Sequence, residues 1–151
     1  MVPRTLPQLL AVDDIVRAHG ETHTIAIIAS TLTRELGRLI RERGMSAQLH
    51  CWNHDDLSLD ADGRAQLAGA VAKIEDLVGT RPAVLYPPWN RTGPELEAAA
   101  LELGLRVSVR KISLEQFIRC RGDVEEETIN FHFWHPEDVA QLPEALRIAS
   151  A

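Results

Sequence analysis

The chain alternates short apolar runs with segments whose apolar residues recur at helical spacing, and this alternation constrains its fold most. Residues 22–29 (THTIAIIA) form an apolar run of strand length. The segment after it carries apolar residues every three or four positions, at Leu32, Leu36, Leu39 and Ile40. Strand followed by helix, repeated along a chain, is typical of a parallel sheet or barrel with helices outside it.

The same pattern predicts about six strands with outer helices. The expected strands are residues 6–12, 22–29, 46–52, 83–87, 105–109 and 128–133. The expected helices are residues 31–43, 60–78, 94–103 and 136–148. With 151 residues, no internal repeat and no interdomain linker, residues 1–151 are expected to form a single domain. About nine residues separate the first two strands, which is short for a parallel crossover.

Composition excludes several functional classes. Hydrophobic residues make up 45% and charged residues 25%, as in ordinary globular domains. A net charge of −6 offers no basic footprint for nucleic acid. No apolar run approaches the ~20 residues of a membrane span, and the amino terminus lacks the apolar core of a secretory signal. Cys51 and Cys120 are too few for a disulfide framework, so we expect reduced thiols and a cytoplasmic protein.

Polar and aromatic residues follow several of the predicted strands. In α/β folds the carboxyl ends of the strands carry the functional groups, so these residues are expected to converge on one rim. They are Asp13 and Asp14, His50 and His54, residues 86–89, and His132 and His135.

The histidine pair indicates a metal site. Two histidines four positions apart face one way on a helical turn, so both imidazoles of His50 and His54 can reach a common ion at about 2.0–2.1 Å. Adjacent residues of an extended chain point opposite ways, so one carboxylate of the pair Asp13-Asp14 could bind the metal while the other acts as a base. The alternative for the acid pair is a solvated loop or a helix N-cap.

Four motifs in order resemble those of the polysaccharide deacetylase, or NodB-homology, family (carbohydrate esterase family 4). They are AVDD (residues 11–14), LHCWNHDDLS (49–58), YPPWNRTGPELEAAALELGLRV (86–107) and INFH (129–132). The resemblance covers nearly all of the chain. It implies a compact, distorted (β/α) barrel that removes an acetyl group from an N-acetylated sugar or glycan with one divalent metal, most often Zn²⁺.

The resemblance also implies a role for each matching residue. Asp14, His50 and His54 would hold the metal, Asp13 would be the general base, and His132 would protonate the leaving amine. The backbone N–H of Trp89 would bind the oxyanion, with Tyr86 and Pro88 lining the substrate side.

The chain departs from the family at several motif positions. Tyr86 replaces an arginine that orients the base, for which Arg91 or Arg81 could substitute. Cys51 stands where the family has Ser or Thr, and we expect a packed thiol there. The family's Asp and Trp after the fifth strand have no clear match, and His135 competes with His132 for the acid role.

Two further features carry alternatives. Trp52 and Trp89 are expected to be half-buried walls of the barrel mouth, with a sugar-stacking platform as the alternative for Trp89. The acidic runs at residues 55–56 and 125–127 are expected to be solvated surface. Besides the deacetylase, two functions stay open: a non-catalytic deacetylase-like protein that binds metal or glycan, and a metal-dependent hydrolase of a non-sugar amide.

Overall fold

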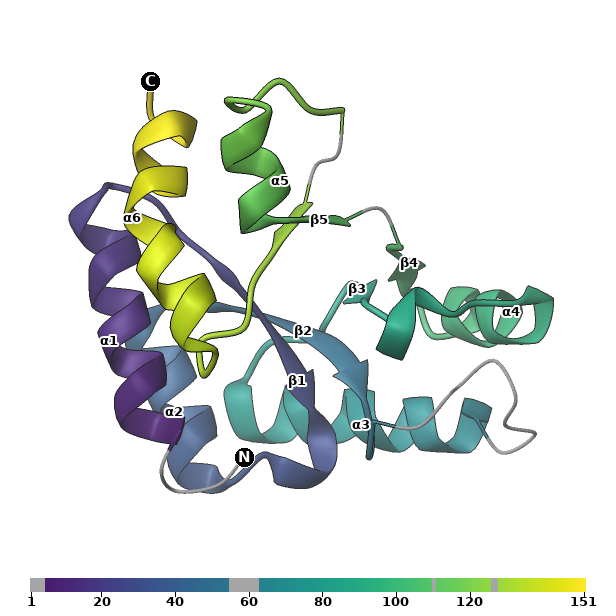
Figure 1. Cartoon of the computed structure of the whole chain (residues 1–151). Helices are drawn as coiled ribbons and strands as arrows, with labels where there is room; N and C mark the ends of the chain where they lie inside the picture. Colours follow the sequence, from purple (N-terminus) through teal and green to yellow (C-terminus); the bar gives the residue numbers. More distant parts are fainter. Residues whose placement is uncertain (1–4, 55–62, 110, 126–127) are drawn as a thin grey trace. The chain divides into compact units, whose positions relative to one another are not determined.

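The computed structural model describes residues 5–54, 63–109, 111–125 and 128–151 (Figure 1). These residues divide into two compact units. The first is Thr24–Val109, and the second combines the residues up to His23 with those from residue 110 onward.

The first unit is built on a four-stranded parallel sheet in the order β1-β2-β3-β4. The strands are β1 (Thr24–Ile28), β2 (Ser46–Cys51), β3 (Val84–Leu85) and β4 (Arg106–Val107). The helices of this unit are α2 (Arg34–Arg43), α3 (Gly63–Val78) and α4 (Pro94–Glu102), with short 3-10 turns η1 (Ala29–Thr31) and η3 (Pro88–Asn90). Because all four strands are parallel, their carboxyl ends lie along one edge of the sheet.

Helix α3 packs against β2 and against both α2 and α4. The approach of α2 to α3 depends on Gly37, since a Cβ there would collide with the backbone carbonyl of Leu77. Burial alternates along β2, so that Ala47, Leu49 and Cys51 enter the core. His50 therefore projects from the opposite face of the sheet.

The second unit packs helices around a short parallel pair of strands. Its elements are α1 (Thr5–Ala18), β5 (Lys111–Ser113), α5 (Leu114–Arg119), β6 (Thr128–Asn130) and α6 (Pro136–Ala149). Figure 1 shows α1 and α6 side by side, and α6 also contacts α5. One buried cluster of this unit contains Val12, Val16, Leu114, Phe117, Leu142 and Ala145.

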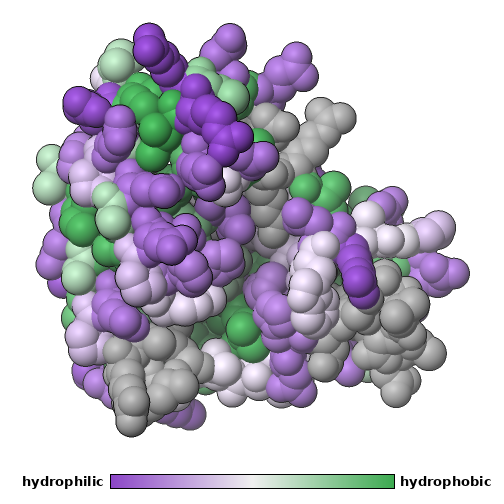
Figure 2. Space-filling view, in the orientation of Figure 1, coloured by the Kyte–Doolittle hydropathy of each residue, from purple (hydrophilic) through white to green (hydrophobic). Residues whose placement is uncertain are grey.

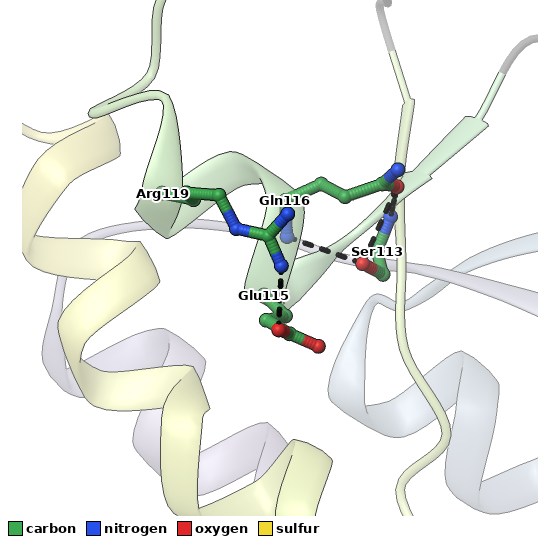
Figure 3. A network of polar contacts seen from close by, with 4 residues as sticks. All are labelled: Ser113, Glu115, Gln116 and Arg119. Atoms are coloured by element: carbon green, nitrogen blue, oxygen red, sulfur yellow. Dashed lines mark hydrogen bonds and ion pairs between the residues drawn. The ribbon is translucent and has the colours of Figure 1, made fainter.

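A capping box joins β5 directly to α5 (Figure 3). The Ser113 hydroxyl accepts a hydrogen bond from the Gln116 backbone N–H (3.2 Å), and the Gln116 side chain accepts one from the Ser113 backbone N–H (3.1 Å). Glu115 pairs with Arg119 at 2.6 Å, one turn further along. These contacts satisfy the first backbone donors of a helix that would otherwise be too short to persist.

The predicted α/β class, with six strands and outer helices among the described residues, is confirmed. Each predicted helix, and every predicted strand except the first, has a counterpart in the structure. The strand predicted at residues 6–12 is wrong, because this stretch lies in α1. Its apolar residues Leu9, Val12 and Val16 recur at helical spacing and are all buried. The short connection before β1 is therefore a helix-to-strand link, not a strand crossover.

β5 and α5 were not predicted from the sequence, and the single-domain organisation of residues 1–151 stays a prediction. Neither Cys51 nor Cys120 forms a disulfide within the described residues.

No helix in the described part of the chain is long and apolar enough to cross a membrane. Hydrophilic residues predominate on the face drawn in Figure 2. The large apolar side chains that stay exposed among the described residues are Trp89, Leu101, Val109 and Trp134. The two tryptophans matter here, because each lies beside a histidine that the sequence placed in the site.

Candidate metal and substrate site

His50 and His54 lie at the carboxyl end of β2. His50 belongs to the strand, and the chain then bends so that His54 adopts a left-handed φ of 63°. The backbone N–H of His54 donates a hydrogen bond to the Cys51 sulfur at 2.9 Å, which holds the bend. The two imidazole rings are thereby brought to a centroid distance of 4.9 Å. The sequence placed the pair on a helical turn; the structure brings them together with a strand end and a bend instead.

The ring of His50 is oriented by Tyr86 on the neighbouring strand segment. His50 Nδ1 lies 2.5 Å from the Tyr86 carbonyl oxygen, and a carbonyl only accepts, so Nδ1 carries the proton. That tautomer places the ring's lone pair on Nε2. Histidines that bind metals characteristically donate their other ring N–H to a backbone carbonyl or carboxylate. The Tyr86 carbonyl is itself positioned because the Tyr86 N–H donates to the Leu49 carbonyl across β2 and β3 (2.9 Å).

The separation of the two imidazoles fits a shared ion. Rings that each bind one tetrahedral ion at 2.0–2.1 Å have centroids about 5 Å apart, and the observed distance is 4.9 Å. In the part of the chain that the structure describes, no three His, Cys, Asp or Glu side chains gather as a complete ligand set. Asp55 and Asp56, which follow His54 directly, lie outside the described residues.

Cys51 is fully buried on the core face of β2, which confirms the expected packed thiol. Trp52 is half-buried, as expected, and the ammonium of Lys73, on α3, lies 5.5 Å from its ring centroid. Trp89 differs from the expected half-buried wall, because it is 59% exposed. Its ring meets that of His54 edge-on at 4.7 Å.

The backbone that carries Trp89 is unusual. Trp89 and Asn90 both have positive φ values, 54° and 55°, directly after the buried residues Pro87 and Pro88. A left-handed conformation costs roughly 1 kcal/mol or more at a non-glycine residue. Two in succession, beside the histidine pair, place an exposed indole ring there at the expense of local stability.

Asp13 and Asp14 lie on α1 and not at a strand end. Asp13 is 2% exposed and accepts a hydrogen bond from Arg17 Nε at 2.7 Å, while its other oxygen lies 3.6 Å from His23 Nδ1. Asp14 is exposed. The sequence argument assigned one acid as metal ligand and the other as base because adjacent side chains of an extended chain point opposite ways. Both residues are helical, so this argument no longer applies. Their roles in the site stay predictions.

His23 completes a polar cluster with the buried Asp13 and the exposed Arg17. Burial lowers the pKa of His23 below 6.5, the Asp13 carboxylate opposes that shift, and Arg17 adds to it. Among the described residues no hydrogen-bond partner reaches either ring nitrogen of His23. This cluster was not predicted from the sequence, although the spacing Asp-x-x-x-Arg at residues 13–17 is that of an ion pair on a helix.

Arg81 and Arg91, which were considered as substitutes for the missing arginine, each have contacts within the first unit. Arg81 pairs with Glu75 and donates to the Leu103 carbonyl, both at 3.0 Å, so it ties α3 to the end of α4. Arg91 lies beside Trp89, with its guanidinium carbon 6.0 Å from the ring centroid. Asp13 pairs with Arg17 at 2.7 Å, and the role of either arginine as a substitute stays a prediction.

His132 is held by Asp138, from the first turn of α6. One oxygen of Asp138 accepts from the His132 backbone N–H at 2.7 Å and lies 3.2 Å from His132 Nδ1. β6 ends at Asn130, earlier than expected, so the alternation that favoured His132 over His135 does not extend to either residue. Their rings lie 6.4 Å apart. What distinguishes His132 is its carboxylate partner and the exposed Trp134 at 5.1 Å.

The fold is that of the family 4 carbohydrate esterases. No protein-family model matches the sequence, and no curated protein matches it significantly. Solved structures do match, and the predicted resemblance to polysaccharide deacetylases is therefore confirmed at the level of the fold.

Three of these structures show how similar the folds are. A family 4 carbohydrate esterase from Streptomyces lividans matches with a TM-score of 0.79 and 15% identity, over 93% of this chain and 80% of that one. The peptidoglycan deacetylase PdaC from Bacillus subtilis matches with a TM-score of 0.76 and 19% identity, over 99% and 78%. BA3943, a family 4 pseudoenzyme from Bacillus anthracis, matches with a TM-score of 0.81 and 14% identity, over 95% and 56%.

Proposed function

We propose that this protein is a metal-dependent hydrolase that removes the acetyl group from an N-acetylated sugar or glycan. The observation that carries the proposal is the pair His50 and His54, whose rings have the separation that a shared ion needs. The hydrogen bond from His50 Nδ1 to the Tyr86 carbonyl supports it, since this is the usual outer contact of a metal-binding imidazole. The fold, shared with enzymes named as deacetylases, supports the substrate class.

His50 and His54 would hold the metal, and Asp14 remains the predicted third ligand. A divalent ion bound there, with Zn²⁺ favoured by imidazole ligands, would polarise the acetyl carbonyl and lower the pKa of water. In this proposal the backbone N–H of Trp89 donates to the developing oxyanion, and Tyr86 and Pro88 border the substrate. Asp13 remains the predicted general base.

His132 is the proposed general acid. In this proposal the Nδ1–H of the His132 imidazolium donates a hydrogen bond to Asp138, and the proton on Nε2 passes to the leaving amine, so that a neutral imidazole remains. Asp138 thus acts as a positioning residue, in a chain that lacks the family's own acid after the fifth strand. The cytoplasmic location of the protein stays a prediction.

A non-catalytic metal- or glycan-binding protein is the second candidate. It is favoured by Tyr86, which replaces the family's arginine, and by the similarity of the fold to a pseudoenzyme. A hydrolase of a non-sugar amide is the third.

One experiment separates these functions. Metal content is measured in the purified protein by mass spectrometry, and acetate release is measured from N-acetylglucosamine oligomers and from simple acetamides. We expect about one metal per chain, acetate from the oligomers, and loss of both in His50→Ala. His19→Ala is the matched control, because His19 Nδ1 also contacts a backbone carbonyl, that of Ile15, at 2.8 Å, but lies on α1. Metal without acetate from any substrate would support the non-catalytic protein, and acetate from acetamides alone would support the third function.

A further inference from the structure

We propose that Trp134 forms a sugar-binding platform that holds the pyranose ring bearing the reacting acetamide beside His132. This inference rests on the proposed deacetylase function, because that function assigns His132 to the leaving amine. Both residues belong to the second unit and lie in the segment that connects β6 to α6 (Figure 1).

Trp134 lies outside the apolar packing of its unit. Phe131 and Phe133 are half-buried and pack against the buried cluster that contains Phe117 and Leu142. Trp134, the largest apolar side chain of this segment, is instead 51% exposed. Because burial of a large apolar side chain stabilises a fold, packing alone does not account for the position of this ring.

Backbone and side-chain contacts hold the indole ring in place. The His135 backbone N–H donates a hydrogen bond to the His132 carbonyl at 3.0 Å, which closes a β-turn around Trp134. Asp138 fixes the start of this turn, since it accepts a hydrogen bond from the His132 backbone N–H at 2.7 Å. The rings of Trp134 and Phe133 are 4.9 Å apart, with an angle of 88° between their planes. An exposed ring held in this way loses little conformational freedom when a ligand binds to it.

The surroundings of the ring favour a sugar as its ligand. The face of an aromatic ring is electron-rich and attracts the C–H groups on the apolar side of a pyranose. His132 lies 5.1 Å from the Trp134 ring and 6.4 Å from the ring of His135, and imidazole nitrogens can hydrogen-bond the hydroxyl groups of a sugar. An apolar platform with a few polar groups beside it is typical of small-ligand sites. Since the leaving amine at His132 is attached to a pyranose, we assign the platform to that pyranose and not to a protein partner.

The first test is a titration of the protein as purified with chitotetraose, read by the three indole N–H signals in nitrogen–proton NMR spectra. The signal of Trp134 is the one that is absent from Trp134→Phe. We expect it to shift progressively with chitotetraose. It should stay in place with N-acetylethanolamine, which has an acetamide and a hydroxyl group but no sugar ring. The ligand is in large excess, and spectra are recorded before hydrolysis consumes it.

Variants then separate sugar binding from a structural role of the ring. Trp134→Ala should raise the KM for chitotetraose about tenfold and leave kcat within a factor of about two, because stacking on the sugar is equally strong in the bound and transition states. Trp134→Phe keeps an aromatic face and should recover most of the affinity, whereas Trp134→Leu keeps only apolar bulk and should behave like Trp134→Ala. Leu101→Ala removes another exposed apolar side chain, on α4, and is the control that should match the parent.

A Trp134 signal that does not move with chitotetraose, or that moves equally with N-acetylethanolamine, would overturn the proposal. So would a KM in Trp134→Ala that equals the KM in Leu101→Ala. A fall in kcat without a rise in KM would overturn it as well, because the ring would then only orient His132. The hydrolase proposal stands in each of these cases if the parent protein releases acetate. If it releases none from any substrate, the hydrolase proposal fails, and the NMR titration tests sugar binding by Trp134 separately.

Discussion

The imidazole rings of His50 and His54 lie 4.9 Å apart, although four residues of continued strand would separate them by about 13 Å. The chain closes this gap by bending after Cys51 and placing His54 at a φ of 63°. Local backbone strain is thus coupled to the pairing of the two histidines.

This coupling predicts that substitutions of His54 change two properties independently: the stability of the fold and the binding of metal. His54→Gly should be about 1 kcal/mol more stable than His54→Ala, because only glycine adopts this φ without steric cost. Both variants should lose most of their bound metal, because both lack the imidazole. Urea unfolding and metal content measure the two effects. Equal stability of the two variants, or metal retained in both, would contradict the assignment.

Asp14 is predicted to be the third metal ligand. Its side chain is exposed on α1, so Asp14→Ala should leave the fold intact while lowering metal content from about one per chain to nearly none. Glu144→Ala removes another exposed carboxylate, on α6, and serves as the control. If Asp14→Ala retains metal as fully as Glu144→Ala does, another group completes the site.

Arg17 is expected to stabilise the fold through Asp13. Arg17→Met leaves a carboxylate that is 2% exposed without its guanidinium partner, which should cost about 1–3 kcal/mol of unfolding free energy. The matched control is Arg119→Met, which breaks an exposed pair of the same spacing with Glu115 and should cost less than about 0.5 kcal/mol. Urea unfolding of both variants gives the comparison, and equal losses would show that burial of Asp13 contributes nothing.

His132 and His135 should differ in their effect on the rate. Loss of a general acid typically lowers the rate about 10²–10⁴-fold, so we expect that loss of kcat in His132→Ala with metal retained, and at most a few-fold loss in His135→Ala. Asp138→Ala should also lower kcat, by less than His132→Ala, because it removes the carboxylate that orients the ring. Glu137→Ala, at the neighbouring position, is the control. A larger loss at His135 than at His132 would move the acid role to His135.

His23 should make stability depend on pH. Burial lowers its folded-state pKa below 6.5, so between these two values the unfolded chain binds a proton that the folded chain does not. Stability is therefore fully present above pH 6.5 and falls as the pH drops toward the folded pKa, by up to about 1.4 kcal/mol per pH unit. Urea unfolding at pH 7.5 and 5.5 should show a smaller difference in His23→Gln than in the parent. The same difference in both proteins would exclude His23 as its source.

Most of the first unit was predictable from the sequence because its periodicities are clear and local. Residues 22–29 and 46–52 are apolar runs of strand length, and the helix before Gly44 carries a regular apolar stripe. The histidine pair was recognised for the same reason, since its residue types and spacing are visible without coordinates.

The second unit was less predictable, because short apolar runs do not distinguish a strand from a buried helix. LPQLLAV satisfies both patterns, and it is helical because Leu9, Val12 and Val16 are buried on one side of α1, where Val12 and Val16 join a core with Phe117 and Leu142. β5 and α5 were missed because a three-residue strand and a six-residue helix leave almost no periodic signal.

The sequence by itself determined which side chains this protein has for its chemistry and their order along the chain. Only the tertiary structure decided their partners: the Tyr86 carbonyl for His50, Arg17 for Asp13, and Asp138 for His132. A hydrogen bond depends on position within a few tenths of an ångström, and such positions follow from the packing of distant segments. Residue types and spacing alone do not specify that packing.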